Sequence, residues 1–348
     1  MDIDSATGSL SLAASVALFA LAAVAIGIFG VRMTHVARLL ARTTGLGEAV
    51  MGAVFIGAST SLSGIVASMS AAAAGHAELA VSNSLGGIAA QTMFLAIADM
   101  FYRRANLEHA AASAENLMMS ASLATLLALL LVAFSAPTVE VMAVHPISPV
   151  LFVTYVVTVR VLARTHARPM WVPRRTGETH VETEQPSRRG RAATAAHWLR
   201  FAALAAVVGA AGRVLAATGT TIAASTGLSE GIVGGVFVAV TTSLPELVVA
   251  VTAVRLGALT LAVGDIIGGN AFDTLFIAAS DLAYREGSIY AAVSASEQLW
   301  LAICVLMTGV LMMGLLHRER RGFAAIGTES VLLIAIYLAG LAYLVASG

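Results

Sequence analysis

The chain has 348 residues, of which 58% are hydrophobic and only 11% are charged, and its formal net charge is zero. A soluble domain of this length carries roughly a quarter charged residues, so the composition excludes an ordinary soluble protein and favours one embedded in a lipid bilayer. The single cysteine, Cys304, excludes an internal disulfide and a metal site built from cysteines.

Ten apolar segments follow one another along the chain, and each is long enough to cross a membrane, which takes about 20 mostly apolar residues. They lie near residues 10–31, 46–73, 78–101, 116–136, 147–163, 197–222, 228–253, 259–281, 295–316 and 328–346. The sequence therefore predicts an all-α, polytopic membrane protein with ten transmembrane helices, for which the lipid bilayer is a partner.

The basic residues predict the orientation of these helices. All of them are arginines, and most follow the odd-numbered segments, as Arg32, Arg103 and Arg104 do. The exceptions are Arg285, in an alternate loop, and Arg213, inside the sixth segment. Because basic loops stay in the cytoplasm, these loops are expected inside the cell and both termini outside it, in the plasma membrane. The longest such loop, residues 164–196, is rich in proline and mixed charge, which is typical of a cytoplasmic linker.

The chain contains an internal duplication. Residues 44–102 align with residues 226–284 without a gap, at a constant offset of 182, and 24 of the 59 aligned positions are identical. Shared apolar composition does not explain the matches, because they include glycine, serine, threonine and charged residues. We interpret the alignment as two copies of one ancestral segment.

The duplication divides the chain into two halves of five helices each. The first repeat is expected at residues 1–163, the linker at 164–196 and the second repeat at 197–348. An odd number of helices per half makes the second copy enter the membrane from the opposite side. Inverted repeats of this kind place their substrate site near the bilayer midplane, where the two copies meet.

The seventh and eighth segments carry polar residues within apolar sequence. These residues are Thr241, Thr242, Ser243, Pro245 and Glu246 in the seventh, and Asp265, Asn270 and Asp273 in the eighth. A charged side chain at the bilayer centre costs at least about 2.5–3.5 kcal/mol, so the acids require a cation, a proton or a water-filled cavity. Their oxygens are hard ligands that suit Na⁺, Ca²⁺, Mg²⁺ or Mn²⁺. The pattern predicts a site for inorganic cations.

Two motifs of the second copy resemble the second alpha-repeat of the sodium/calcium exchanger family, within the cation/calcium exchanger superfamily. They are Thr242-Ser243-Leu244-Pro245-Glu246 and Gly264-Asp265-Ile266-Ile267-Gly268-Gly269-Asn270-Ala271-Phe272-Asp273. The resemblance implies a fold of two inverted five-helix repeats and antiport by alternating access, with Na⁺ or H⁺ influx driving Ca²⁺ efflux. It also implies an ion site made of Glu246, Asp273, Asn270, Thr242 and Ser243, joined by Thr60, Ser61 and Gln91 of the first copy.

The first copy departs from the family pattern at its most important position. Where the second copy has Pro245 and Glu246, the first has Ser63 and Gly64, so one of the family's two central carboxylates is missing. Asp265 stands where the family usually has asparagine, and we include it in the candidate site as a partial replacement for that charge. On Coulomb grounds the loss penalises a divalent ion more than a monovalent one.

Three functions remain open after this comparison. The first is a secondary active cation antiporter of the Na⁺/Ca²⁺ type, the second a Na⁺ or K⁺/H⁺ exchanger without Ca²⁺ transport, and the third a membrane scaffold without transport activity. We expect no enzyme and no cofactor, because the sequence has no nucleophile–base motif and no phosphate-binding loop. Nucleic acid is not an expected partner, since the basic loops lack interleaved aromatic residues.

Overall fold

The computed structural model of the protein describes residues 11–347, apart from residues 45–56, 103, 137–138, 168–169, 175, 177–190, 321 and 323–325. These residues form helices, together with one isolated β-bridge between Val141 and Val144. The expected all-α membrane fold is therefore confirmed for the described part of the chain.

The helices follow the apolar segments of the sequence. In chain order they are α2 (Leu12–Ala25), η1 (Ile26–Gly30), α3 (Val31–Thr44), α5 (Gly57–Thr60), α6 (Leu62–Ala73), α7 (Ala77–Asp99), α8 (Leu107–Ala110), α9 (Ala114–Ser135), α10 (Ile147–Ala167), α11 (Arg191–Thr226), α12 (Glu230–Ile232), η3 (Val233–Val238), α13 (Ala239–Thr242), α14 (Leu244–Arg255), α15 (Leu259–Ala283), η4 (Ile289–Ala291), α16 (Ala295–His317) and α17 (Thr328–Ser347).

Ten spans were expected, and the helices agree with that number approximately. Within the described residues, eight helices are long and apolar enough to cross a membrane. A ninth span is the bent pair of residues 230–242 and 244–255, and the short apolar helix α6 falls in the remaining segment. The first part of that segment, residues 46–56, lies outside the described residues.

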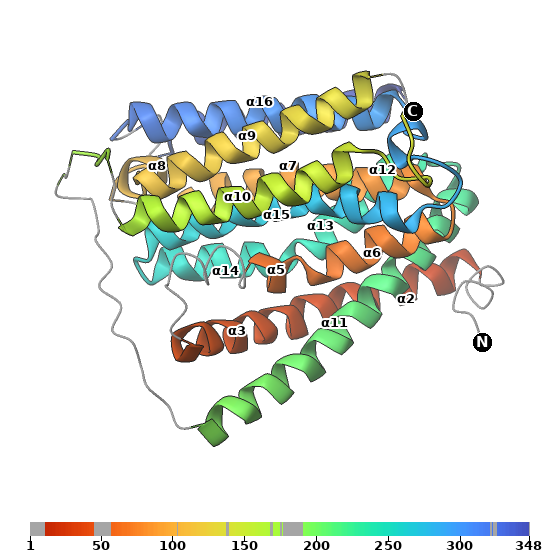
Figure 1. The fold of residues 1–348 in the computed structure, drawn as a ribbon, viewed down its shortest axis with the longest axis horizontal. Coiled ribbons are helices and arrows are strands. Elements are labelled where there is room, and N and C mark those ends of the chain that lie inside the picture. Colours follow the sequence, from red (N-terminus) through yellow and green to blue (C-terminus); the bar gives the residue numbers. More distant parts are fainter. Residues whose placement is uncertain are drawn as a thin grey trace.

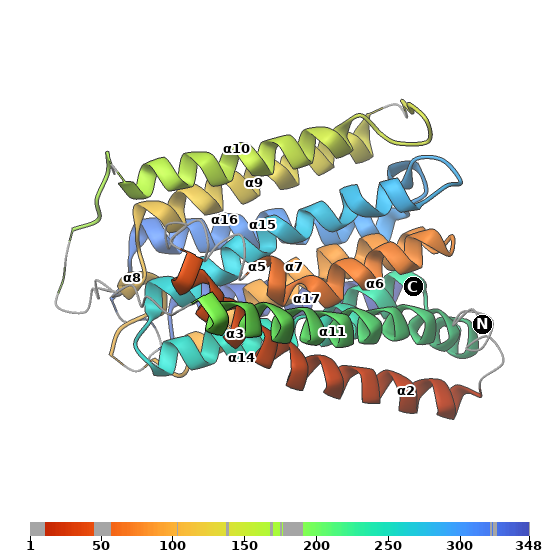
Figure 2. The same cartoon turned by 60° about the horizontal axis from the view of Figure 1, so that its bottom comes forward.

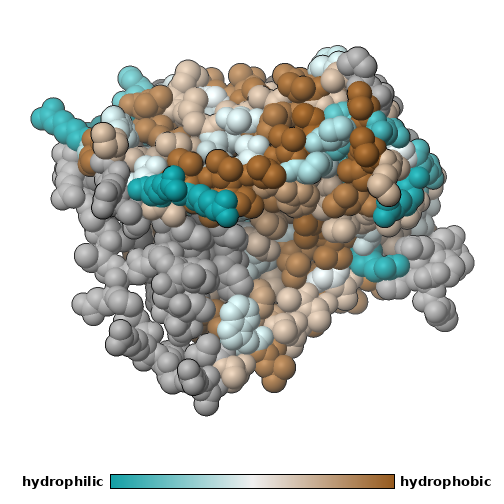
Figure 3. Space-filling view, in the orientation of Figure 1, coloured by the Kyte–Doolittle hydropathy of each residue, from teal (hydrophilic) through white to brown (hydrophobic). Residues whose placement is uncertain are grey.

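Two helices, α7 and α15, occupy the centre of the bundle. Their most apolar stretches are 89% and 83% buried, against 17% for the span that begins with α2. The other long helices surround them, as Figure 1 and Figure 2 show from two directions. Among the residues coloured in Figure 3, apolar ones cover most of the middle of the bundle, and the most hydrophilic ones lie toward its ends. The bundle thus has an apolar outer surface that fits a lipid bilayer, and its least apolar spans, α7 and α15, are buried inside it.

Glycines let the central helices approach one another closely. A Cβ atom on Gly86 of α7 would collide with the backbone of Gly235 in η3, and one on Gly57 would lie 3.6 Å from the backbone nitrogen of Gly269. Small residues at helix contacts are the usual means of bringing backbones together in membranes. The duplicated segments are therefore packed backbone against backbone at the centre.

Both copies contain a broken helix, and the break falls at equivalent positions. Ser61 separates α5 from α6 with φ −80° and ψ 3°, and Ser243 separates α13 from α14 with φ −93° and ψ 5°. The second break bends the chain by 44°. Proline follows the break only in the second copy, as Pro245, so the break itself does not depend on proline. Each break opens a helix terminus beside α7 and α15.

Two further features concern the ends of the described chain and the segment between its halves. The start of α2 and the end of α17 lie at the same end of the bundle (Figure 1). Helix α10 continues to Ala167 and α11 begins at Arg191. Most of the linker expected at residues 164–196 lies outside the described residues, and the division into two repeats stays a prediction.

Candidate ion-binding site

A small cavity lies where the two helix breaks meet the central helices. Its volume is about 10 Å³, which is room for about one water molecule or one bare ion. The residues that line it come from α6, α7, α13, α14, α15 and the two breaks, and they are Ser61, Gly64, Asn83, Gly87, Gln91, Thr242, Ser243, Glu246, Asp273 and Phe276. Both copies of the duplicated segment therefore contribute to one cavity.

Glu246 reaches the cavity from the first turn of α14, directly after the break at Ser243. Its side chain is only 2% exposed. One carboxylate oxygen, Oε1, accepts a hydrogen bond of 3.5 Å from the Ser61 hydroxyl, and Thr60 also contacts this carboxyl group. The other oxygen, Oε2, has no hydrogen-bond partner among the described residues. The start of a helix carries partial positive charge, so the position favours an acid without neutralising it.

Asp273 faces the same cavity from α15 and is 1% exposed. Its Oδ2 atom accepts a hydrogen bond of 2.6 Å from Nε2 of Gln91, and the same nitrogen lies 3.3 Å from the Ser243 hydroxyl. The Oδ1 atom of Asp273 and the Oε1 atom of Gln91 have no partner within the described chain. Gln91 thus orients one carboxylate oxygen and leaves the other available.

The unsatisfied atoms around the cavity are all hydrogen-bond acceptors. Glu246 Oε2, Asp273 Oδ1 and Gln91 Oε1 are buried oxygen atoms, and no arginine or histidine belongs to the lining residues. A buried acceptor without a partner costs free energy, and a buried carboxylate costs more. A single cation bound among these three oxygens would give each of them a partner. The donor set fits a hard cation or a proton, not an anion.

Asn83 is a lining residue that the sequence interpretation missed. Its amide nitrogen donates to the Gly64 carbonyl at 3.1 Å and to the Ser68 hydroxyl at 2.8 Å, and its oxygen lies 3.4 Å from the Thr242 hydroxyl. The offset of 182 pairs Asn83 with Asp265, so the duplication carried a signal for it. Asn83 fixes Thr242 of the second copy against the broken helix of the first.

Three residues expected at the site do not line the cavity. Asn270 is buried but donates to the Thr92 hydroxyl at 2.9 Å, and the Thr60 hydroxyl donates back to the Gly57 carbonyl at 2.9 Å. Asp265 is also buried outside the cavity, although its charge acts on Glu246. The remaining six expected residues, Glu246, Asp273, Thr242, Ser243, Ser61 and Gln91, lie together around it.

An aromatic ring fills the place of the missing carboxylate. A Cβ atom on Gly64 would lie 2.6 Å from Cε2 of Phe276, so no side chain fits at position 64 unless the ring moves. Phe276 stacks edge-on against Phe272, which stacks in turn against Tyr155 of α10. The apolar wall replaces what would otherwise be the symmetry mate of Glu246. The cavity therefore holds two carboxylates, both from the second copy.

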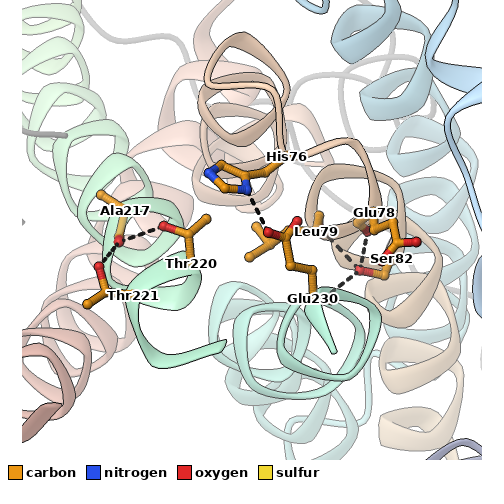
Figure 4. Close-up of polar contacts among 8 residues, drawn as sticks. All are labelled: His76, Glu78, Leu79, Ser82, Ala217, Thr220, Thr221 and Glu230. Carbon is orange, nitrogen blue, oxygen red and sulfur yellow. Dashed lines mark hydrogen bonds and ion pairs between the residues drawn. The ribbon is translucent and has the colours of Figure 1, made fainter. Parts of the chain in front are cut away.

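A polar contact joins the two copies at one end of the bundle. Nδ1 of His76, in the turn between α6 and α7, lies 2.6 Å from Oε1 of Glu230 at the start of α12. The Ser82 hydroxyl of α7 lies 3.4 Å from the Glu230 carbonyl, as Figure 4 shows. These contacts hold the entry of the broken span against the central helix.

Comparison with known proteins gives a family and a fold. The family model described as "Sodium/calcium exchanger protein" matches residues 14–163 and 196–346, well over half of the chain. No curated protein sequence matches the chain.

Solved structures of the sodium-calcium exchanger NCX_Mj have a similar fold. The structure of NCX_Mj soaked with 10 mM Na⁺ and zero Ca²⁺ shows a TM-score of 0.61 and 17% identity, covering 95% of this chain and 99% of that one. The structure soaked with 100 mM Na⁺ and 10 mM Sr²⁺ shows a TM-score of 0.59 and 18% identity over the same shares. At this level of identity the likeness concerns the fold alone.

Proposed function

The chain belongs to the sodium/calcium exchanger family, and we propose that it is a secondary active cation antiporter of the Na⁺/Ca²⁺ type that carries its ions through the cavity at Glu246 and Asp273. The support is the set of three buried acceptor oxygens without partners around one small cavity. Each ion that enters would replace its hydration shell with these oxygens and with the hydroxyls of Ser61 and Ser243. The ions are the substrates of the protein, and no resident cofactor is part of the proposal.

Charge balance supports a divalent ion as one of the substrates. Glu246 and Asp273 together supply two negative charges, and no positive side chain lines the cavity. One Ca²⁺ ion neutralises both carboxylates, as do two Na⁺ ions or one Na⁺ ion and one proton. Alternation between such states, each neutral overall, is the electrostatic basis of coupled exchange in a medium where net charge is costly.

The position of the cavity supports alternating access. It lies between the two copies, beside a helix break in each, and breaks of this kind provide the free backbone groups and the bending points that transport requires. Ser61 and Ser243 stand at these breaks and also line the cavity. A movement of either broken helix relative to α7 and α15 would therefore open the cavity toward one end and change the ion's ligands at the same time.

A second function is favoured by one feature, the ring of Phe276 at Gly64. Because the ring takes the place of a third carboxylate, the site has less negative charge than a family member with both central glutamates. This composition suits exchange of Na⁺ or K⁺ for H⁺, in which Glu246 and Asp273 bind a proton and a monovalent cation in turn. The multi-pass protein would sit in the plasma membrane in either case, with the arginine-rich loops in the cytoplasm.

Flux measurements on protein reconstituted into vesicles test these proposals. An outward or inward Na⁺ gradient should drive ⁴⁵Ca²⁺ against its own gradient if the first function is right. A Na⁺ or K⁺ gradient should move protons and leave Ca²⁺ in place if the second is right. Glu246→Gln should abolish the flux, while Glu286→Gln, an exposed acid near the end of α15, serves as the matched control.

The flux assay also defines the outcome against both functions. Protein that is folded and reconstituted, yet moves no cation under any gradient, would be a scaffold without transport activity. A flux that Glu246→Gln leaves unchanged would show that the ions take another route. In either case the cavity described above would lose its proposed role.

A further inference from the structure

A buried aspartate connects the two copies at the end of the bundle where α7 finishes. Asp99, the last residue of α7, accepts a hydrogen bond of 2.7 Å from the backbone of Leu107 at its Oδ1 atom. Its Oδ2 atom accepts two more, from the backbone of Gly327 and from the hydroxyl of Ser330, each at 3.0 Å. Both donors to Oδ2 stand at the start of α17, so this aspartate fixes α17 to α7.

The opposite end of the bundle repeats this arrangement at an offset of 182 residues. Asp281 accepts from the backbone of Ile289 at Oδ1, and from the backbone of His145 and the hydroxyl of Ser148 at Oδ2. Each of these four positions is the counterpart of one at the Asp99 end. The correspondence therefore extends beyond the aligned segments into the residues that follow them. The Asp99 and Asp281 ends can be compared position by position.

The two ends differ in the group that contacts the serine hydroxyl. Tyr290 places its OH 3.0 Å from the Ser148 hydroxyl, whereas at the equivalent position Glu108 places its Oε1 3.2 Å from the Ser330 hydroxyl. A phenol brings its own hydrogen, which allows tyrosine to donate to serine and serine to donate to aspartate. Ser330 has one hydrogen for two carboxyl groups. Both contacts are hydrogen bonds only when Asp99 or Glu108 carries a proton. Asp99 already accepts from two backbone N–H groups, which favour its ionised form, so the proton belongs on Glu108.

The second oxygen of Glu108 faces another acid. Glu108 is 1% exposed and Glu329 is 8% exposed. The Oε2 atoms of both have no partner within the described chain, and each lies 3.3 Å from the position that a Cβ atom on Gly327 would take. Asn106 directs its amide nitrogen, which also has no described partner, to the same point. Both oxygens therefore lie close to one point, and the charge of Glu329 disfavours the ionised form of Glu108.

The charges around Glu108 come from four packed elements, and the nearest are negative. Asp99 on α7 and Glu329 on α17 both act on Glu108. Directly after α16, the guanidinium of Arg318 donates to the carbonyls of His109 and Arg174. Helix α15 carries Asp265 in its second turn, and α8 itself carries His109, whose Nδ1 lies 2.7 Å from the Arg318 carbonyl.

No ion pair in the described residues involves Glu108, and its environment favours the neutral acid. Burial, followed by the charge of Asp99, raises the pKa of Glu108 to about 8. The raised pKa of Glu108 and the single hydroxyl hydrogen of Ser330 both indicate that Glu108 is protonated.

We propose that Glu108 is a proton-binding site, separate from the transport cavity, whose occupancy controls the junction of α7, α8 and α17. With the proton bound, Glu108 donates to Ser330 as Tyr290 does to Ser148. When the proton leaves, the carboxylates of Glu108, Glu329 and Asp99 repel one another, and α8 loosens from the start of α17. The junction lies at the end of the bundle where α8 is drawn in Figure 1 and Figure 2, which the arginine distribution assigns to the cytoplasm. Helix α7 transmits the change, since Gln91 lies two turns before Asp99.

Infrared difference spectroscopy on the full chain in lipid vesicles tests this site without any transport. The wild-type protein should lose the carbonyl band of one protonated carboxylic acid as the pH rises through about 8, and Glu108→Gln should lack that change. Tyr290→Phe, which removes the hydroxyl at the equivalent position, is the matched control and should keep it. Identical difference spectra for wild type and Glu108→Gln would overturn the proposal.

A second variant keeps the test decisive if Glu108→Gln does not fold. Glu329→Gln removes the facing charge, so the midpoint of the same band should move to lower pH. An unchanged midpoint in Glu329→Gln would show that the two acids do not interact and would overturn the site. A band that ignores pH but disappears on adding Ca²⁺ would also overturn it, because the ligand would then be a metal ion.

Discussion

Gln91 donates a hydrogen bond of 2.6 Å to Asp273, and the two residues are 182 positions apart, so they are symmetry mates in the duplicated segments. Equivalent positions of the two aligned segments, an amide in the first and a carboxylate in the second, are therefore in direct contact. The same offset separates Gly64 from Glu246. In both pairs only the second copy has an acidic residue. The negative charge of the cavity therefore comes from α14 and α15 alone.

Replacing Gln91 tests the role of this hydrogen bond. Gln91→Leu removes the donor to Asp273 and leaves a buried carboxylate oxygen unpaired, which costs about 1–3 kcal/mol. We expect a lower melting temperature in detergent, and we expect added Ca²⁺ or Na⁺ to restore part of it. Gln91→Glu is the paired variant, because it adds charge and should strengthen cation binding. Equal melting temperatures for wild type and Gln91→Leu would contradict this account.

Cation binding should stabilise the protein through Glu246 and Asp273. A ligand at about 100 times its dissociation constant adds about 2.7 kcal/mol to the free energy of unfolding. Titration with Ca²⁺, Sr²⁺ or Na⁺ should therefore raise the melting temperature of wild type and of Glu286→Gln. The same titration should leave Glu246→Gln and Asp273→Asn unchanged. A full response in Glu246→Gln would place the bound cation elsewhere.

Restoring the missing carboxylate should require two changes. Gly64→Glu alone forces its side chain against the ring of Phe276, and overpacking of this kind costs about 1–3 kcal/mol. Combining it with Phe276→Ala opens the space and adds a third acid to the cavity. We expect the double variant to bind Ca²⁺ more tightly than Phe276→Ala alone, measured by calorimetry. Equal affinities in these two proteins would show that position 64 does not face the ion.

Close contact between helix backbones should make Gly86 intolerant of any side chain. Gly86→Ala places a methyl group on the backbone of Gly235, and we expect a loss of about 1–3 kcal/mol or failure to fold. Gly309→Ala is the matched control, because no atom lies within 4 Å of its Cβ position. In a helix that substitution should be neutral or stabilising. Thermal unfolding of Gly86→Ala and Gly309→Ala under the same conditions tests this prediction. Equal melting temperatures would contradict it.

Stability should depend on pH through Glu108. Its pKa is raised from 4.5 to about 8 in the folded protein, so the folded state holds a proton that the unfolded state releases between these values. The free energy of unfolding should therefore fall as the pH rises from about 4.5 to about 8. In Glu108→Gln this part of the decline should be absent. Parallel melting curves across that range for both proteins would refute the assignment.

The amino-acid sequence was enough to predict most of the spans, the duplication and both acids of the cavity, Glu246 and Asp273. Hydropathy depends only on local composition and the offset of 182 needs no coordinates, while Ser61 and Gln91 were expected at the site because of the family resemblance. The same offset paired Asn83 with Asp265 but did not say that Asn83 would line the cavity.

Which of these groups lie in contact depends on how the helices pack. The packing of α7 against α15, together with the helix breaks at Ser61 and Ser243, fixes the directions of the side chains at the site. Asn270 turns to Thr92, Phe276 fills the space at Gly64, and Glu108 faces Glu329 from across the chain. Such contacts depend on the packing of helices far apart in sequence, and no periodicity within one helix records them.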